Sequence, residues 1–203
     1  MNRVLVVAAC RVVLAGLLVL VAGCDRDHIG PWQEQVRLGD GRVIVVERDE
    51  RFRVSDPIGD VGAAFIQNTT LRFIDPPALA ELPTLSIGYR PILLDYDPEG
   101  GYWYVIAVND HACWPTEAEW KAGHLNATGR ANIHPNFEYR LIDGTWREVE
   151  IGADRIGRGA NLLITRTTID DFDVVPLSEK HRLDGHPRLP EPYRRVEPLI
   201  ACR

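Results

Sequence analysis

The sequence has few cysteines, only three serines and no excess of positive charge. Four cysteines among 203 residues are too few for a small domain held together by disulfides, although they allow one bridge. Lysine and arginine together number 23 against 29 aspartates and glutamates, and this acidic balance argues against nucleic acid as a partner. With 45% hydrophobic and 26% charged residues, the composition is that of one ordinary globular domain.

Motifs that carry common enzyme chemistry are also missing. The three serines stand in no G-x-S-x-G, S-x-x-K or P-loop pattern, and Gly157-Arg-Gly159 lacks the third glycine of a dinucleotide-binding loop. The histidines show neither H-E-x-x-H nor H-x-x-x-H spacing. Asp95-Tyr-Asp97 resembles the opening of a calcium loop, but the position that needs a glutamate holds Ile106. The sequence therefore predicts no metal site and no cofactor, and we interpret the acidic cluster Asp170–Asp173 as a charged loop.

The longest apolar run lies near the start of the chain. It covers 11 residues from Val12 to Ala22 and follows Arg11, a length typical of the apolar region of a signal peptide and short of the roughly 20 residues that span a bilayer. The run ends in Val21-Ala22-Gly23-Cys24. A plain signal peptide, or an uncleaved anchor around Arg11, would also contain such a run, but an arginine in mid-span disfavours the anchor.

The segment Leu20-Val-Ala-Gly-Cys24 resembles the lipobox of bacterial lipoproteins. The resemblance implies that a diacylglyceryl group is attached to the thiol of Cys24, that the chain is cut after Gly23, and that palmitate or a similar acyl chain modifies the new amino terminus. Several acyl chains give stable membrane attachment, unlike a single one. We therefore expect a signal peptide at 1–23, a tether at 24–31, and a location in the bacterial cell envelope facing the periplasm. Asp25 resembles the inner-membrane retention signal of enteric bacteria, and the choice between inner and outer membrane stays open.

Residues 32–203 are predicted to form a single domain made mostly of strands. Asp40-Gly41 and Asp143-Gly144 each separate two β-prone runs, which is a strong hairpin pattern because the turn needs positive φ. A third hairpin is expected to join residues 91–94 to 102–108. Further strands are expected at 70–74 and 161–166, and loops at 55–69, 75–83 and 184–198. The predicted fold class is mainly β, with antiparallel sheets in a sandwich or an irregular barrel.

Helix is expected to be scarce, with one or two short segments. Thr116-Glu-Ala-Glu119 has the pattern of a capping box, and a second short helix is expected to begin at Ser178. The aromatic residues Trp103, Trp114 and Trp120, with the neighbouring tyrosines, are interpreted as core, and a ligand groove is the alternative.

Two cysteines remain in the exported body once Cys10 leaves with the signal peptide and Cys24 carries lipid. Cys113 and Cys202 are 89 residues apart, and an oxidising periplasm favours a disulfide between them. Closing so long a loop stabilises a fold by about 4.5 kcal/mol in the chain-entropy model. Two buried thiols, or a redox or metal pair, are the alternatives, although the absence of a C-x-x-C spacing disfavours the second.

Three segments, at 36–48, 139–146 and 161–164, resemble a group of uncharacterised proteobacterial lipoproteins. This resemblance implies an envelope location and no known activity. The favoured function is a non-enzymatic binding or structural module, anchored by lipid, whose partner is an envelope protein or a small ligand. The alternative is a lipid-anchored hydrolase or metal-dependent enzyme that uses His111, Asp170 or Asp173.

Overall fold

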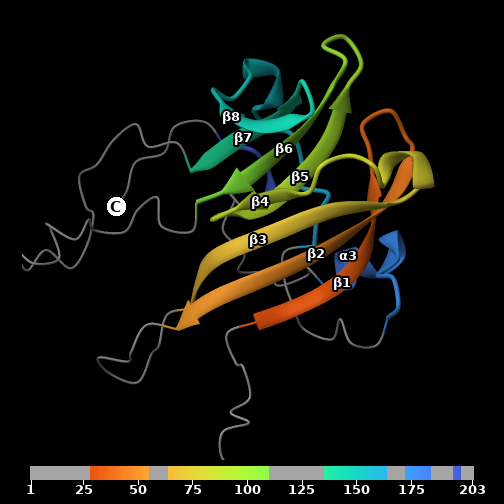
Figure 1. Cartoon of the computed structure of the whole chain (residues 1–203), viewed down its shortest axis with the longest axis vertical. Helices are drawn as coiled ribbons and strands as arrows, with labels where there is room; N and C mark the ends of the chain where they lie inside the picture. Colours follow the sequence, from red (N-terminus) through yellow and green to blue (C-terminus); the bar gives the residue numbers. More distant parts are fainter. Residues whose placement is uncertain (1–27, 55–63, 110–134, 164–171, 184–193, 198–203) are drawn as a thin grey trace, which may run out of the picture.

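Eight strands in two antiparallel sheets make up most of the computed structural model, which describes residues 28–54, 64–109, 135–163, 172–183 and 194–197. Sheet A has the order β1-β2-β3-β4 and sheet B the order β5-β6-β7-β8 (Figure 1). The strands of sheet A are β1 (His28–Arg37), β2 (Val43–Val54), β3 (Ala64–Asp75) and β4 (Leu85–Ile87). Those of sheet B are β5 (Arg90–Asp97), β6 (Tyr102–Val108), β7 (Asn136–Ile142) and β8 (Thr145–Val149).

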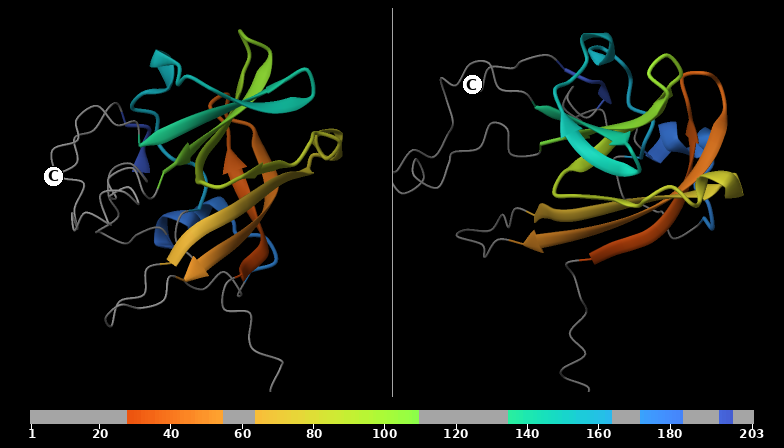
Figure 2. Two further views of the ribbon diagram at one scale, coloured as in Figure 1. Left: turned by 60° about the vertical axis from the view of Figure 1, so that its left-hand side comes forward. Right: turned by 45° about the horizontal axis from the view of Figure 1, so that its top comes forward.

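The two sheets form separate layers that pack face to face (Figure 2). The main core contains buried residues from both sheets, among them Val36, Val46 and Phe73 from sheet A and Leu94 and Val105 from sheet B. The predicted mainly-β class is therefore confirmed, and of the two architectures left open the strands form the sandwich-like one. The short helix α3 (Leu177–Leu183) contacts β1, and the single-turn 3₁₀ helices η1 (Pro77–Leu79) and η2 (Ala153–Arg155) lie in loops.

All three predicted hairpins are present. The two Asp-Gly turns lead from β1 to β2 and from β7 to β8, and in the second both Asp143 (φ 51°) and Gly144 (φ 71°) have the positive φ that this type of turn requires. The third hairpin joins β5 to β6, and its turn follows Asp97, because Asp95, Tyr96 and Asp97 still pair with β6. The expected turn between strands is therefore present, two residues after Asp95. Local turn chemistry was sufficient for these predictions.

Several element boundaries differ from the expectation. β1 begins at His28, so residues 28–31 belong to the sheet and only 25–27 separate it from Cys24. β3 begins at Ala64, so the expected loop is wrong over residues 64–69. Ile66 and Thr69 are buried and pair with β2, and this pairing outweighs the turn preference of the nearby glycines. β4 was not expected at all. The helix expected at Ser178 is confirmed as α3, one residue longer at its start.

The strand expected from Asn161 is wrong over the described residues 161–163. Side-chain and single backbone hydrogen bonds replace a strand ladder there. The Asn161 amide bonds both the Leu94 N–H (2.9 Å) and the Leu94 carbonyl (2.8 Å), and the Leu163 N–H donates to the Glu34 carboxylate (2.8 Å). The segment is therefore fixed between a strand of sheet B and a strand of sheet A. The helix expected near Thr116 lies outside the described residues. Of the loop expected at 184–198, only residues 194–197 are described.

Candidate functional site

Most residues singled out from the sequence lie outside the described ranges. These are Cys24, the pair Cys113 and Cys202, and two of the three residues of the enzyme alternative, His111 and Asp170. The lipid attachment, the disulfide and the enzyme alternative accordingly stay predictions. Asp173 is described and exposed, and it lies at the edge of a small cavity treated below.

Two of the three aromatic residues of β6 belong to the interior rather than to a groove, and the third, Tyr102, is half-buried. Trp103 is 7% exposed and packs edge-on against Phe73 of the opposite sheet, with ring centroids 4.9 Å apart. Tyr104 is fully buried. The core interpretation therefore holds for these two side chains, while Trp114 and Trp120 lie outside the described residues.

A buried group of four charges, called here the Arg48 cluster, lies on sheet A. It consists of Arg48, Glu34, Glu50 and Lys180. The Arg48 guanidinium, with no exposed side-chain area, bonds Glu34 Oε1 at 3.1 Å and Glu50 Oε1 at 2.6 Å. It also donates to the Leu163 carbonyl (2.5 Å) and lies 4.9 Å from the centre of the Trp32 ring. Two cations and two carboxylates thus balance in a largely buried space, in which Lys180 is 9% exposed.

Lys180 connects this cluster to helix α3. Its ammonium group lies 2.5 Å from Glu34 Oε2 and donates to the carbonyls of Gln35 (2.9 Å) and Asn161 (2.5 Å). Although burial opposes ionisation, the positive charges of Lys180 and Arg48 lower the pKa of Glu34 below its ordinary value. The three N–H groups of the Lys180 ammonium thus have Glu34, Gln35 and Asn161 as acceptors, which fixes the side chain between β1 and residue 161.

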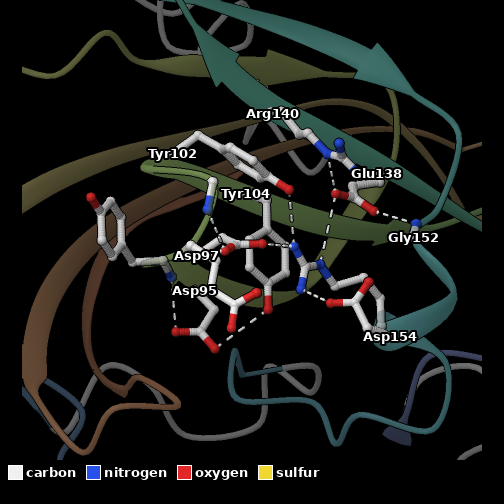
Figure 3. A network of polar contacts seen from close by, with 12 residues as sticks. Asp95, Asp97, Tyr102, Tyr104, Glu138, Arg140, Gly152 and Asp154 are labelled. Atoms are coloured by element: carbon white, nitrogen blue, oxygen red, sulfur yellow. Dashed lines mark hydrogen bonds and ion pairs between the residues drawn. The ribbon is translucent and has the colours of Figure 1, made fainter.

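A second group, called here the Arg155 cluster, joins the turn after β8 to sheet B (Figure 3). It consists of Arg155, Asp97, Glu138, Arg140 and Asp154. The Arg155 guanidinium bonds the carboxylates of Asp97 and Asp154 and lies 4.0 Å from the centre of the Tyr104 ring. Glu138 accepts from Arg140 Nε at 2.5 Å and from the Gly152 N–H at 2.9 Å. The cluster thereby holds residues 152–155 against β5, β6 and β7.

A neighbouring ion pair links the same region to sheet A. Arg158 pairs with Asp95, whose other oxygen accepts the Gly39 N–H at 3.0 Å. Asp95 thus connects three parts of the chain: the turn after β1, the strand β5 and the segment 157–159, which resembles a dinucleotide-binding loop only in its first two glycines. The role of Arg158 in the described structure is to stabilise these contacts.

The electrostatics of the clusters suit structure better than acid–base catalysis. Every carboxylate in the two clusters, and Asp95 beside them, is paired with an arginine or a lysine. The Gly100 N–H and the Arg155 guanidinium lower the pKa of Asp97 to about 2, whereas a carboxylate that exchanges protons near neutral pH needs a raised pKa. The lowered pKa of Asp97 therefore argues against a role in proton exchange, and the ion pairs of both clusters hold segments of the chain together.

A cavity of about 720 Å³ opens beside α3, within the range of roughly 300–1,000 Å³ typical of small-molecule sites. Its described walls are apolar and cationic: Arg37, Ala160, Asn161, Leu162, Leu177, Ser178 and Lys180. Arg37 is exposed, and among the described residues its guanidinium makes no ion pair. Among the described residues that line the cavity, the amine that accompanies Ser178 is Lys180, and each of its N–H groups already has an acceptor. This wall can bind a ligand, and among the described residues it offers no nucleophile with its base.

A smaller cavity of about 420 Å³ lies near the start of β1, between Trp32 and Phe172, with Asp173 and Glu47 at its edge. Asp173 is the only residue of the enzyme alternative that the described structure places at a cavity, and Glu47 is already paired with Arg72 at 2.7 Å. Nothing in the described ranges brings three His, Cys, Asp or Glu side chains together as a metal site would require.

The Arg48 cluster was missed from the sequence, although a pattern pointed to it. Side chains two apart on a strand share a face, so Glu34 lies between Trp32 and Val36, and Arg48 and Glu50 continue the face of Val46. Charged residues at inward positions on two paired strands predict a buried ion pair. The Arg155 cluster has no such pattern, because Asp97 and Arg155 meet only through the tertiary fold.

Among the described residues, no helix has the length and hydrophobicity needed to cross a bilayer. No family model, no curated protein and no solved structure matches this chain. The function must therefore be argued from the lipobox-like segment and from the geometry of the cavity and the two clusters.

Proposed function

We propose that the protein is a lipid-anchored module of the bacterial cell envelope that faces the periplasm and binds a small ligand without catalysis. The ligand carries an anionic group and an apolar part, and its site is the cavity beside α3. The observation that carries the proposal is the composition of that cavity's wall, described above. The other partner is the membrane itself, through the acyl chains on Cys24.

The anchor is supported by the order of features at the start of the chain. An apolar run of signal-peptide length ends at small residues and a cysteine, and the folded sheet begins four residues after that cysteine. Lipid attached at Cys24 would hold such a domain at a membrane surface without any spanning segment.

Ligand binding is supported by the different surroundings of the two cations, Lys180 and Arg37, that line the cavity beside α3. Lys180 is neutralised by Glu34 and shapes the wall, whereas Arg37 has no ion pair among the described residues and is available to an anion. Leu162 and Leu177 supply the apolar surface next to it. A fatty-acid-like carboxylate has both of the features that this wall recognises.

The test is calorimetric titration of octanoate into the full lipoprotein held in lipid nanodiscs, with empty nanodiscs as the blank. Ser178→Trp places a large ring in the cavity from an exposed position of α3 and should abolish the heat of octanoate binding above the blank. Ser178→Ala should leave this heat of binding unchanged. Arg37→Gln should weaken binding about tenfold, as expected for the loss of one charged hydrogen bond at an accessible site. The matched control is Arg42→Gln, at an exposed arginine outside the cavity.

Heat equal to the blank, or binding that Ser178→Trp leaves unchanged, would contradict the assignment of the cavity. The enzyme alternative depends on residues that are mostly outside the described ranges, and the described structure provides no observation that favours it.

A further inference from the structure

The distance along the chain between the proposed lipid anchor and the sheet restricts how the domain stands on a membrane. β1 begins at His28, four residues after Cys24. Four residues of fully extended chain span at most about 14 Å. The start of β1 therefore lies within about 14 Å of the lipid-bearing residue, and this inference rests on the lipid anchor of the proposed function.

The strand register identifies what else lies at that end of sheet A. His28 pairs with Arg51 of β2, and Arg51 pairs with Asn68 of β3. The opposite end of β1 is Arg37, paired with Val43. Nine residue steps at about 3.3 Å each separate the two ends by about 30 Å. Figure 1 shows the start of β1 low in the molecule and the β5–β6 turn at its top.

The flank of the domain is poorly suited to lie flat on lipid. The outer edge of β1 is covered, because the Gln35 N–H donates to the Val175 carbonyl and the Val175 N–H donates to the Gln33 carbonyl. Lys180 donates to the Gln35 carbonyl as well. Among the described residues the only exposed large hydrophobic side chains are Val43 and Ile156, and Val43 is at the far end of the strand. Removal of residues 1–23, with two arginines and no acid, would change the formal charge from −6 to −8, which an anionic surface repels.

Arg51, near the start of β1, favours contact with an anionic lipid surface, unlike the acidic domain as a whole. It is exposed, and within the described part of the chain it makes no ion pair. A cation at this position is attracted to the phosphates of anionic lipid headgroups. The short tether and the local charge thus favour the same end of the sheet.

The row of His28, Arg51 and Asn68 marks the start of β1, and β2 and β3 continue three pairs beyond it, to Val54 and Ala64. We propose that sheet A approaches the lipid surface with the end at which β1 begins, so that Arg51 lies near headgroup phosphates and β1 leads away from the membrane. The cavity beside Arg37 is then held up to about 30 Å from the lipid and opens to the aqueous side. Its ligand reaches it from water, not by lateral movement within the bilayer.

The test uses the full lipoprotein in vesicles of phosphatidylethanolamine with a minority of phosphatidylglycerol and of lipids spin-labelled at the headgroup. A fluorescent amino acid is introduced either at Gln67, exposed beside Arg51, or at Glu99, exposed in the β5–β6 turn. Strong quenching at Gln67 and none at Glu99 is the expected result. A long flexible insertion between Asp27 and His28 should remove the quenching at Gln67, and Arg51→Gln should reduce it where Arg42→Gln does not.

The failures of the two proposals are distinguishable. Protein that floats with the vesicles but is quenched equally at both positions lies flat, which would overturn the orientation and leave the anchor intact. Stronger quenching at Glu99 would mean the reverse orientation. Protein that carries no lipid and does not float with the vesicles would contradict the anchor, and with it the orientation.

Discussion

The Arg48 and Arg155 clusters use the same chemistry in two different environments. In the first, the Arg48 and Glu34 side chains have no exposed area and Lys180 has 9%. In the second, Arg155 has 6% exposed, but its partner Asp154 has 66%. Loss of Arg48 would affect Glu34 and Glu50, whose side chains are 0% and 3% exposed. Loss of Arg155 would break its hydrogen bonds to Asp97 and Asp154, which are 16% and 66% exposed and which water partly solvates, whereas the buried Glu138 would keep Arg140. Burial of the partners, more than the number of ion pairs, should determine how much each cluster matters to stability.

The two clusters also differ in what they connect. The Arg48 cluster joins β1 and β2 to α3 and to residues 161–163, which together form the wall of the larger cavity. The Arg155 cluster secures a surface turn to sheet B. Disruption of the first should therefore disturb ligand binding as well as stability, and disruption of the second should affect stability alone.

The largest effect is expected for Arg48→Met. Glu34 would keep Lys180 but lose Arg48, and Glu50 would lose its arginine inside the protein. Breaking a buried ion pair by removing one partner costs about 3–5 kcal/mol of unfolding free energy. Urea unfolding of the lipoprotein measures the change. Arg72→Met, which breaks an exposed pair with Glu47, is the matched control and should cost no more than about 1 kcal/mol. Similar small losses for both variants would remove the distinction between buried and exposed pairs.

An intermediate effect is expected for Arg155→Met. Hydrogen bonds to Asp97 and Asp154 would be lost, but water can replace part of them, so the expected cost is about 1–3 kcal/mol. Arg147→Met, at an exposed position of β8 outside the cluster, should be close to neutral in the same urea experiment. If Arg155→Met cost as much as Arg48→Met, exposure of the partner carboxylates would not explain the difference between the clusters.

The smallest effect concerns pH. The pKa of Asp97 is lowered from 3.8 to about 2 by the Gly100 N–H and Arg155, so its stabilising contribution is present above about pH 4 and is lost as the pH falls toward 2. The urea concentrations at the unfolding midpoints of the native protein and of Asp97→Asn should therefore differ most above pH 4 and converge toward pH 2. A difference between them that stays constant across this range would show that ionisation of Asp97 does not contribute.

The sequence predicted the parts of the fold that depend on neighbours in the chain. The Asp40-Gly41 and Asp143-Gly144 turns impose hairpins because few other residues adopt the positive φ required. The mainly-β class followed from these turns and the alternating runs around them. Short helix α3 was also predictable, within one residue of its start.

Features that depend on distant contacts could not be predicted in the same way. Asn161 looks β-prone in its local context, yet its amide bonds both polar backbone groups of Leu94, 67 residues away, and the segment takes that conformation instead. The pairing of Asp97 with Arg155 spans 58 residues and has no local pattern. The Arg48 cluster is an intermediate case. The alternation along the strands indicates that Glu34, Arg48 and Glu50 face inward, but no sequence pattern predicts that Lys180 on α3 joins them.

The central claim, that lipid on Cys24 attaches this domain to a membrane, is tested most directly by labelling cells with radioactive palmitate. The native protein should be labelled and recovered with membranes, and Cys24→Ala should lose the label. A matched Cys113→Ala variant should keep it. Label retained in Cys24→Ala, or a native protein that never takes up palmitate, would contradict the account.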